Sequence, residues 1–201
     1  MRLLAKADSD FDEVREVLKR MIDDGHRASH IISSIRAMFR KDRREKLPVS
    51  IRDLVYEVLA LVRGELASQR VSLDVELREE LPRVMGDRVQ LQQVLLNLIM
   101  NAVEAMSSVE GCERSLLVKA EFDGARNVLI IVEDSGPGID PNNTDRIFNP
   151  FFTTKSHGMG LGLSICRSII ESHGGRLWVS ARTPHGAVFH VQLPSGVSVG
   201  K

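Results

Sequence analysis

The sequence EDSGPGID at residues 133–140 decides the fold, because it ends one apolar run and opens a glycine-rich turn. The preceding residues 128–132, VLIIV, have the composition of a buried strand. Acid and glycine directly after a strand occur where the chain leaves a sheet and its backbone can approach a ligand. The Asp134 carboxylate can accept a hydrogen bond from an exocyclic amine such as that of adenine. An ordinary turn has the same composition, so neighbouring patterns must distinguish the two.

A second glycine-rich stretch, GMGLGLS at residues 158–164, precedes an apolar-periodic helix predicted over residues 165–172. Glycines that open a helix leave backbone N–H groups free to face phosphate oxygens, whose charge the helix dipole favours. A dinucleotide-binding fold would place this turn after its first strand, with an acidic residue about twenty positions later. Here the turn lies late in the chain, so the sequence indicates a different kind of phosphate site.

A helix predicted over residues 87–106 carries the third pattern. Asp87 with Gln90 three residues later resembles a capping box. One face is apolar and is expected in the core: Val89, Val94, Leu95, Leu98, Ile99, Ala102 and Met106. A polar stripe recurs at steps of three or four: Gln90, Gln93, Asn97, Asn101 and Glu104. A solvated face would also explain this stripe, but asparagine is a poor helix former, and two of them one turn apart favour a binding role. An amide oxygen is a suitable ligand for Mg²⁺.

In this order the patterns resemble the N, G1, F and G2 boxes of bacterial sensor histidine kinases, which belong to the GHKL (Bergerat-fold) ATPases. Residues 97–102, NLIMNA, resemble the N box, and residues 134–138 resemble the G1 box. Residues 147–155, IFNPFFTTK, resemble the F box, and residues 158–162 the G2 box. The resemblance covers residues 47–194, and four motifs in the same order make it specific.

The resemblance implies a site for ATP and Mg²⁺. It implies that Asp134 binds the adenine amino group, that Asn101 ligates Mg²⁺, and that Asn97 assists with metal or phosphate. Gly136 and Gly138 would let the backbone approach the base. The other positions assigned to the nucleotide belong to the F box and to the lid over the phosphates: Thr154, Gly158, Gly160, Leu161 and Gly162. Lys155 would neutralise phosphate charge, while the lid would be anchored by Phe148, Phe151 and Phe152.

Position 97 distinguishes relatives of this fold. The ATP-hydrolysing members and the anti-sigma serine kinases are similar, but they place a glutamate where this chain has Asn97. An amide cannot accept a proton as a carboxylate does, so hydrolysis should be poorly promoted. The resemblance therefore implies transfer of the γ-phosphoryl group of Mg-ATP to a histidine, for relay to an aspartate in a response-regulator receiver domain.

A separate domain is predicted over residues 1–46. Apolar residues of the segment 14–39 alternate steps of four and three, which predicts one long amphipathic helix with a seam for a helical bundle. This helix resembles the second helix of a dimerisation and phosphotransfer domain, which implies a homodimer in the parent protein. In the family the acceptor histidine precedes Glu or Asp. Neither His26 nor His30 does so, and we expect the acceptor to be absent from this chain.

The second domain, residues 47–201, is expected to be α+β: a two-layer sandwich of a mixed β-sheet and three helices. Ser50 with Asp53 predicts a capped helix from residue 51 to about residue 69. Strands are predicted over residues 71–77, 115–122, 127–133, 176–182 and 187–193, and the last two would form a hairpin. Trp178 and Phe189 are expected in the core.

Composition bounds the partners. Lys+Arg and Asp+Glu both total 27, so no net field favours nucleic acid or an anionic membrane. Cys112 and Cys166 lack metal or disulfide spacing and are expected as free thiols in a reducing compartment. No apolar run approaches the roughly twenty residues of a membrane span. We therefore expect a cytoplasmic chain without a membrane segment, whose parent protein could be anchored in the membrane.

Two alternatives to a kinase stay open. The chain could be a nucleotide-binding regulatory module without catalysis, because the acceptor helix is missing, although intact motifs argue against this. It could also be a GHKL ATPase of the chaperone or mismatch-repair type, which would need a carboxylate near Asn97.

Overall fold

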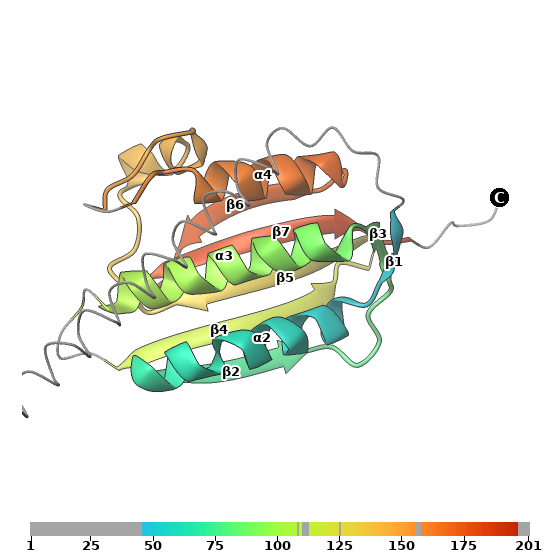
Figure 1. The fold of residues 1–201 in the computed structure, drawn as a ribbon, viewed down its shortest axis with the longest axis horizontal. Coiled ribbons are helices and arrows are strands. Elements are labelled where there is room, and N and C mark those ends of the chain that lie inside the picture. The colour runs from blue at the N-terminus through green and yellow to red at the C-terminus, as the bar shows by residue number, and fades with distance from the viewer. Residues whose placement is uncertain (1–45, 108, 110–112, 125, 156–157, 197–201) are drawn as a thin grey trace, which may run out of the picture. The chain divides into compact units, whose positions relative to one another are not determined.

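A computed structural model describes residues 46–196 except 108, 110–112, 125 and 156–157. Its centre is a five-stranded sheet of order β2-β4-β5-β7-β6 (Figure 1). The pair β2 (Val71–Leu77) and β4 (Arg114–Phe122) is parallel. All other pairs, formed with β5 (Asn127–Asp134), β6 (Arg176–Ala181) and β7 (Ala187–Pro194), are antiparallel. The predicted α+β sandwich with a mixed sheet is confirmed, whereas the predictions for residues 1–45 lie outside the described residues.

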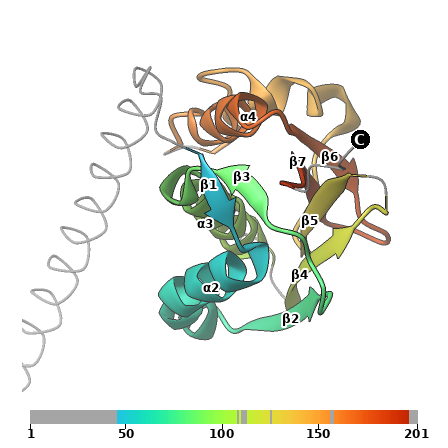
Figure 2. The same ribbon diagram turned by 90° about the vertical axis from the view of Figure 1, so that its right-hand side faces the viewer.

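Three α-helices form the second layer, on one face of the sheet (Figure 2). They are α2 (Ile51–Ser68), α3 (Arg88–Ser107) and α4 (Gly162–Ser172). The start of α2 is as predicted, because Ser50 Oγ accepts a hydrogen bond from the Asp53 amide. Asp87 Oδ1 likewise accepts from the amides of Val89 and Gln90 at the start of α3. Helix α4 begins at Gly162 rather than at residue 165, so the glycine-rich stretch runs directly into its first turn.

The alternation of β5 places the predicted base-binding carboxylate on the face that the helices cover. Every second residue of this strand is buried: Val128, Ile130, Val132 and Asp134. Because side chains of a strand alternate between the two faces, Asp134 continues the apolar series toward α3. Its position in the buried layer therefore follows from the strand's period.

Two core assignments are wrong. Val89 is 59% exposed, and α3 instead buries Leu91 and Val103 in addition to the other predicted positions. Trp178 is only half-buried and stacks on the ring of His190, its partner across the β6–β7 pair, with centroids 4.9 Å apart. These two rings lie on the sheet face opposite the helices, since the neighbouring residues of both strands are buried beneath them. Phe189 is buried as predicted.

Short elements escaped prediction. The strands β1 (Leu47–Val49) and β3 (Val84–Gly86) pair antiparallel in a small second sheet. Two 3₁₀ turns, Pro141–Asn143 and Arg146–Phe148, connect β5 to the second glycine-rich stretch. Three residues are too few to show a period, which explains why none of the four was predicted.

His173 joins the end of α4 to the start of α3. Its Nε2 accepts a hydrogen bond from the Asp87 amide at 3.0 Å. The neutral ring must therefore carry its proton on Nδ1, which donates to the Ile169 carbonyl oxygen at 2.7 Å. Burial lowers the pKa of His173 below its usual 6.5, and the nearby Lys46 charge adds to this, while the Ile169 contact and the Asp87 charge oppose it.

We expect the free energy of unfolding to decrease as the pH falls below 6.5. In this pH range the unfolded chain binds a proton at His173 more readily than the folded chain does. The stability that is fully present above the unfolded-state pKa is therefore lost as the pH falls toward the lower pKa of the folded state. His190, whose pKa burial also lowers, acts in the same direction. Urea unfolding at about pH 7.5 and about pH 5.5 measures the effect. His173→Gln should reduce this pH dependence, and an undiminished dependence in that variant would contradict the assignment.

Candidate functional site

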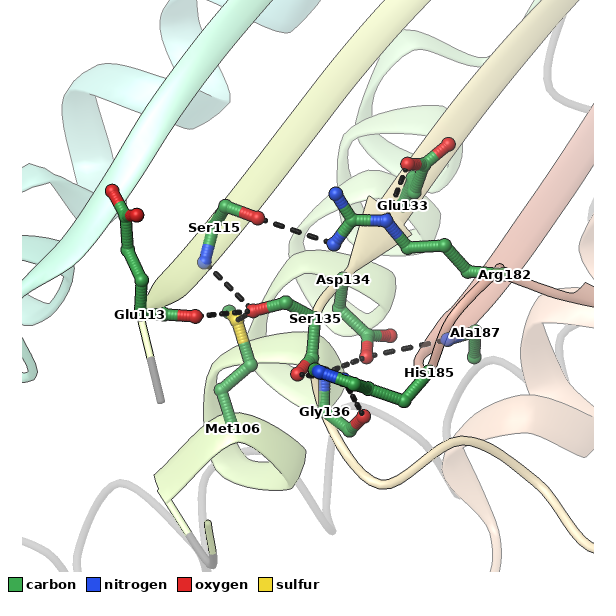
Figure 3. Close-up of polar contacts among 10 residues, drawn as sticks. All are labelled: Met106, Glu113, Ser115, Glu133, Asp134, Ser135, Gly136, Arg182, His185 and Ala187. Carbon is green, nitrogen blue, oxygen red and sulfur yellow. Dashed lines mark hydrogen bonds and ion pairs between the residues drawn. The ribbon is translucent and has the colours of Figure 1, made fainter. Parts of the chain in front are cut away.

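Asp134 ends β5 with its two carboxylate oxygens in different environments (Figure 3). Oδ1 accepts hydrogen bonds from the backbone amides of Gly136 at 2.8 Å and Ala187 at 3.4 Å. Oδ2 has no such donor among the described residues. Burial raises the pKa of Asp134, while the two amide contacts and the charge of Arg182 oppose the rise. The carboxylate is thus held by one oxygen and offers the other to a ligand donor.

The turn between β6 and β7 packs directly against this strand end. Gly186 has φ 123°, and a Cβ there would lie 2.0 Å from the Asp134 carbonyl oxygen. Gly138, with φ 79°, approaches Gly186 so closely that its own Cβ would be 3.0 Å from the Gly186 oxygen. His185 Nδ1 lies 3.1 Å from the Ser135 carbonyl oxygen, to which it donates. Sequence reasoning found the turn as a hairpin connection but missed that Gly186 and His185 belong to this site.

Ser135 anchors the start of the glycine turn to the neighbouring strand (Figure 3). Its hydroxyl donates to the Glu113 carbonyl oxygen at 3.0 Å and accepts from the Ser115 amide at 2.8 Å. Arg182 lies nearby, with Nε 2.7 Å from Glu133 Oε1 and Nη1 3.1 Å from Ser115 Oγ. Ser135 therefore fixes the start of the turn to β4, and Arg182 links β4 to β5 beside it, as a preorganised site requires.

Helix α3 links this turn to the predicted metal ligand. A Cβ at Gly136 would lie 3.3 Å from the Cβ of Ala105, so the turn rests on α3 one helical turn beyond Asn101. Asn101 is half-buried, and its Oδ1 lies 3.5 Å from Lys155 Nζ. Lys155 Nζ also meets Glu104 Oε2 at 2.5 Å. The structure thus brings the predicted site residues Asn101 and Lys155 together, and it adds Glu104 to the site. In the sequence, the only indication for Glu104 was its position in the polar stripe of the helix.

Asn97 faces α4. It is 8% exposed, and its Nδ2 donates to Cys166 Sγ at 3.0 Å. A Cβ at Gly162 would lie 2.8 Å from the same nitrogen, so glycine is needed for the helices to approach. Burial raises the pKa of the Cys166 thiol to about 12, which keeps it protonated. Among the described residues, the Asn97 amide hydrogen-bonds to Cys166 and not to a carboxylate.

The stretch resembling the F box is joined to the second glycine stretch by the backbone. The Phe151 amide donates to the Gly160 carbonyl oxygen at 2.9 Å, and a Cβ at Gly160 would lie 2.4 Å from the Phe152 oxygen. Gly158 packs on the Thr153 hydroxyl in the same way, while Thr154 is exposed.

The start of α4 has its backbone amides available. The side chain of Leu161 is buried, so only its backbone can face a ligand. No side chain of the described part caps this helix start. Uncapped amides at a helix N-terminus suit an anion.

The phenylalanines differ from one another. Phe148 is buried, and Phe152 is half-buried beneath the Arg146 guanidinium, 4.8 Å above its ring. Phe151 is 75% exposed and has φ 66°. The ring of Phe151 therefore faces solvent, and this residue contacts the second glycine stretch through its backbone amide.

The chemistry of the donors limits how a metal could bind. Within the described part of the chain, no group of three His, Cys, Asp or Glu side chains is close enough to hold an ion. A cage built from three such side chains is therefore not available there. Mg²⁺ ordinarily binds through one or two protein oxygens and substrate phosphates, which the amide oxygen of Asn101 fits.

Comparisons with known proteins agree with this geometry. Residues 86–197 match the family model described as histidine kinase-, DNA gyrase B- and HSP90-like ATPase. The sensor histidine kinase TmoS of Ectopseudomonas mendocina is 40% identical over 184 residues, 90% of this chain and 19% of that protein. The solved catalytic domain of the histidine kinase ThkA is 37% identical with a TM-score of 0.68, covering 76% of this chain and 97% of that one. ThkA solved with the response regulator protein TrrA is 33% identical with a TM-score of 0.70, covering 87% and 49%.

The fold and these matches define an ATP-binding protein of the GHKL type, and the chain belongs to the family of histidine kinase-, DNA gyrase B- and HSP90-like ATPases. More narrowly, it contains the catalytic domain of a sensor histidine kinase. The chain spans about a fifth of the length of TmoS. None of the described helices is both long and apolar enough to cross a bilayer.

Proposed function

We propose that this chain binds Mg-ATP at the end of β5 and donates its γ-phosphoryl group to a histidine of a phosphotransfer helix. The observation that carries the proposal is the Asp134 carboxylate, buried on the helix face with Oδ1 held by two amides. Its other oxygen accepts from the adenine amino group, and Gly136 and Gly138 let the backbone approach the base.

The phosphates extend from this base pocket along α3 toward α4. Asn101 provides an amide oxygen for Mg²⁺, which when bound neutralises charge on the phosphates. The remaining assigned positions surround the phosphates with backbone amides and one cation: Thr154, Lys155, Gly158, Gly160, Leu161 and Gly162. The uncapped start of α4 supports this part of the proposal, because its dipole favours negative charge.

Asn97 favours transfer to histidine over hydrolysis. Its amide is engaged with Cys166 and cannot take a proton from water. A histidine acceptor needs no base to expose its lone pair, so positioning and charge neutralisation are sufficient. We include Asn97 in the catalytic site as the residue that packs α3 against α4 beside the metal and phosphates.

We further propose the partners of the parent protein. ThkA was solved with a response regulator, which supports a receiver domain as the next acceptor for this chain's parent. The predicted seam of residues 14–39 would form a homodimer in that parent, with residues 1–46 as part of the phosphotransfer bundle and residues 47–201 as the ATP-binding domain. Both ATP and receiver domains occur in the cytoplasm, where we place this domain even if the parent is anchored in the membrane.

Transfer of labelled γ-phosphate from Mg-ATP tests the proposal. The chain is incubated alone, and acid lability of the label and bound nucleotide are scored on the same sample. We expect bound nucleotide without label, and labelling of a separate bundle that supplies the acceptor helix. Rapid steady release of ADP and inorganic phosphate would favour the hydrolase instead, and absence of bound nucleotide would refute the site.

Asn101→Ala should weaken ATP binding by about tenfold when magnesium is present and much less when it is chelated, because it removes one metal-ligand oxygen. Calorimetric titration with ATP, with and without magnesium, measures both affinities. Asn127→Ala, at the distant start of β5, is the matched control and should leave them unchanged. Equal sensitivity of wild type and Asn101→Ala to magnesium would remove Asn101 from the metal site.

A further inference from the structure

Glu104 and Lys155 form an ion pair beside Asn101, the predicted metal ligand. Glu104 lies on α3 one turn after Asn101, whereas Lys155 belongs to the loop that precedes the second glycine stretch. The Lys155 ammonium is 2.5 Å from Glu104 Oε2 and 3.5 Å from Asn101 Oδ1. These are the two contacts of the ammonium group in the described part of the chain.

The pair contributes little to stability, since the side chains are 44% and 56% exposed. Exposed ion pairs gain little, because water screens the charges and two long side chains lose freedom. A free lysine on a loop would sample many rotamers. The effect of Glu104 is therefore to place the ammonium group beside one particular amide oxygen.

We propose that Glu104 is a positioning residue that aims Lys155 at the triphosphate. This inference rests on the proposed function, because it gives Lys155 a fixed place beside the metal-binding oxygen of Asn101. Protein kinases of an unrelated fold hold their phosphate-binding lysine with a glutamate from a helix in the same manner. Glu104 and Lys155 are the equivalent arrangement here, built from α3 and the loop before α4.

The proposal predicts that ATP affinity changes in the direction opposite to the one that charge repulsion alone would give. Removing a carboxylate beside a triphosphate should by itself strengthen ATP binding, because like charges repel. If Glu104 instead acts by aiming Lys155, its removal should weaken binding despite that relief. The direction of change in Glu104→Gln therefore separates positioning from simple repulsion.

A double-mutant cycle on the full chain tests this, with dissociation constants for ATP in the presence of magnesium measured by calorimetry. We expect Glu104→Gln to weaken binding about fivefold and Lys155→Met about tenfold, as for one partly exposed charge-assisted contact. Adding Glu104→Gln to Lys155→Met should cause no further loss, because the residue it positions is gone. Thermal unfolding should show the same midpoint in all four proteins.

Glu121→Gln is the matched control, since Glu121 pairs with Lys119 on β4 with comparable exposure. It should leave ATP affinity unchanged. Unchanged or stronger binding in Glu104→Gln would overturn the proposal, as would an equal loss in the Lys155→Met background. Either outcome can be distinguished from a failure of the proposed function, because in that case the wild-type protein itself would not bind ATP.

Discussion

Replacing Asp134 with asparagine is expected to weaken ATP binding by about a hundredfold while leaving the fold intact. The variant keeps an oxygen that can accept from the Gly136 and Ala187 amides, so the local structure is retained. Its amide nitrogen then replaces the free carboxylate oxygen and turns two donors toward the adenine amino group. An unsatisfied donor pair in a buried site costs about 3 kcal/mol, or about a hundredfold in affinity.

Calorimetric titration with ATP and GTP measures this change. Guanine presents a carbonyl oxygen where adenine presents its amino group, so the preference for ATP over GTP should also decrease in the variant. Asp74→Asn, on the exposed side of β2, is the matched control and should bind ATP as wild type does. Unchanged ATP affinity in a folded Asp134→Asn protein would remove Asp134 from the base pocket.

Gly186→Ala is expected to destabilise the domain by about 3 kcal/mol and to weaken ATP binding, because overpacking adds to backbone strain. The new Cβ would lie 2.0 Å from the Asp134 carbonyl oxygen, so either the turn or the end of β5 must move. Neither can move cheaply, because β5 and β7 are paired up to Glu133 and Val188. Urea unfolding gives the loss of stability.

Gly124→Ala serves as a comparison for Gly186→Ala, because it introduces backbone strain without a steric clash of the new Cβ. Gly124 has φ 76°, but a Cβ there would meet nothing within 4 Å. This variant should lose only about 1 kcal/mol, the cost of a left-handed conformation in a residue with a side chain. Equal losses in the two variants would show that the contact between the turn and Asp134 is unimportant.

The sequence predicted the parts of the site that lie in one element, and it missed those that depend on the order of strands. Asp134, Asn101 and the glycine-rich stretches each follow from a local period or turn. The approach of Gly186 and His185 to Asp134 depends on β7 pairing with β5, which no local pattern reveals.

Exposure of large side chains was also difficult to predict. Trp178 and Val89 carry apolar side chains at positions whose burial depends on which face the opposing layer covers. Phe151 adopts positive φ to bring its amide to Gly160, which turns its ring toward solvent. These outcomes follow from tertiary contacts that override residue type.

Because Cys166 is buried, its rate of alkylation can be used to measure how often the packing around it opens. A protonated thiol beneath α3 does not react with alkylating agents, because only the thiolate is nucleophilic. Its modification therefore records the fraction of molecules in which Cys166 is exposed, either by separation of α4 from Asn97 or by unfolding. ATP should slow that modification in proportion to occupancy, since a ligand that binds only the closed protein depletes the open form. Mass spectrometry of the peptide containing Cys166 would thus give nucleotide affinity without a label on the nucleotide.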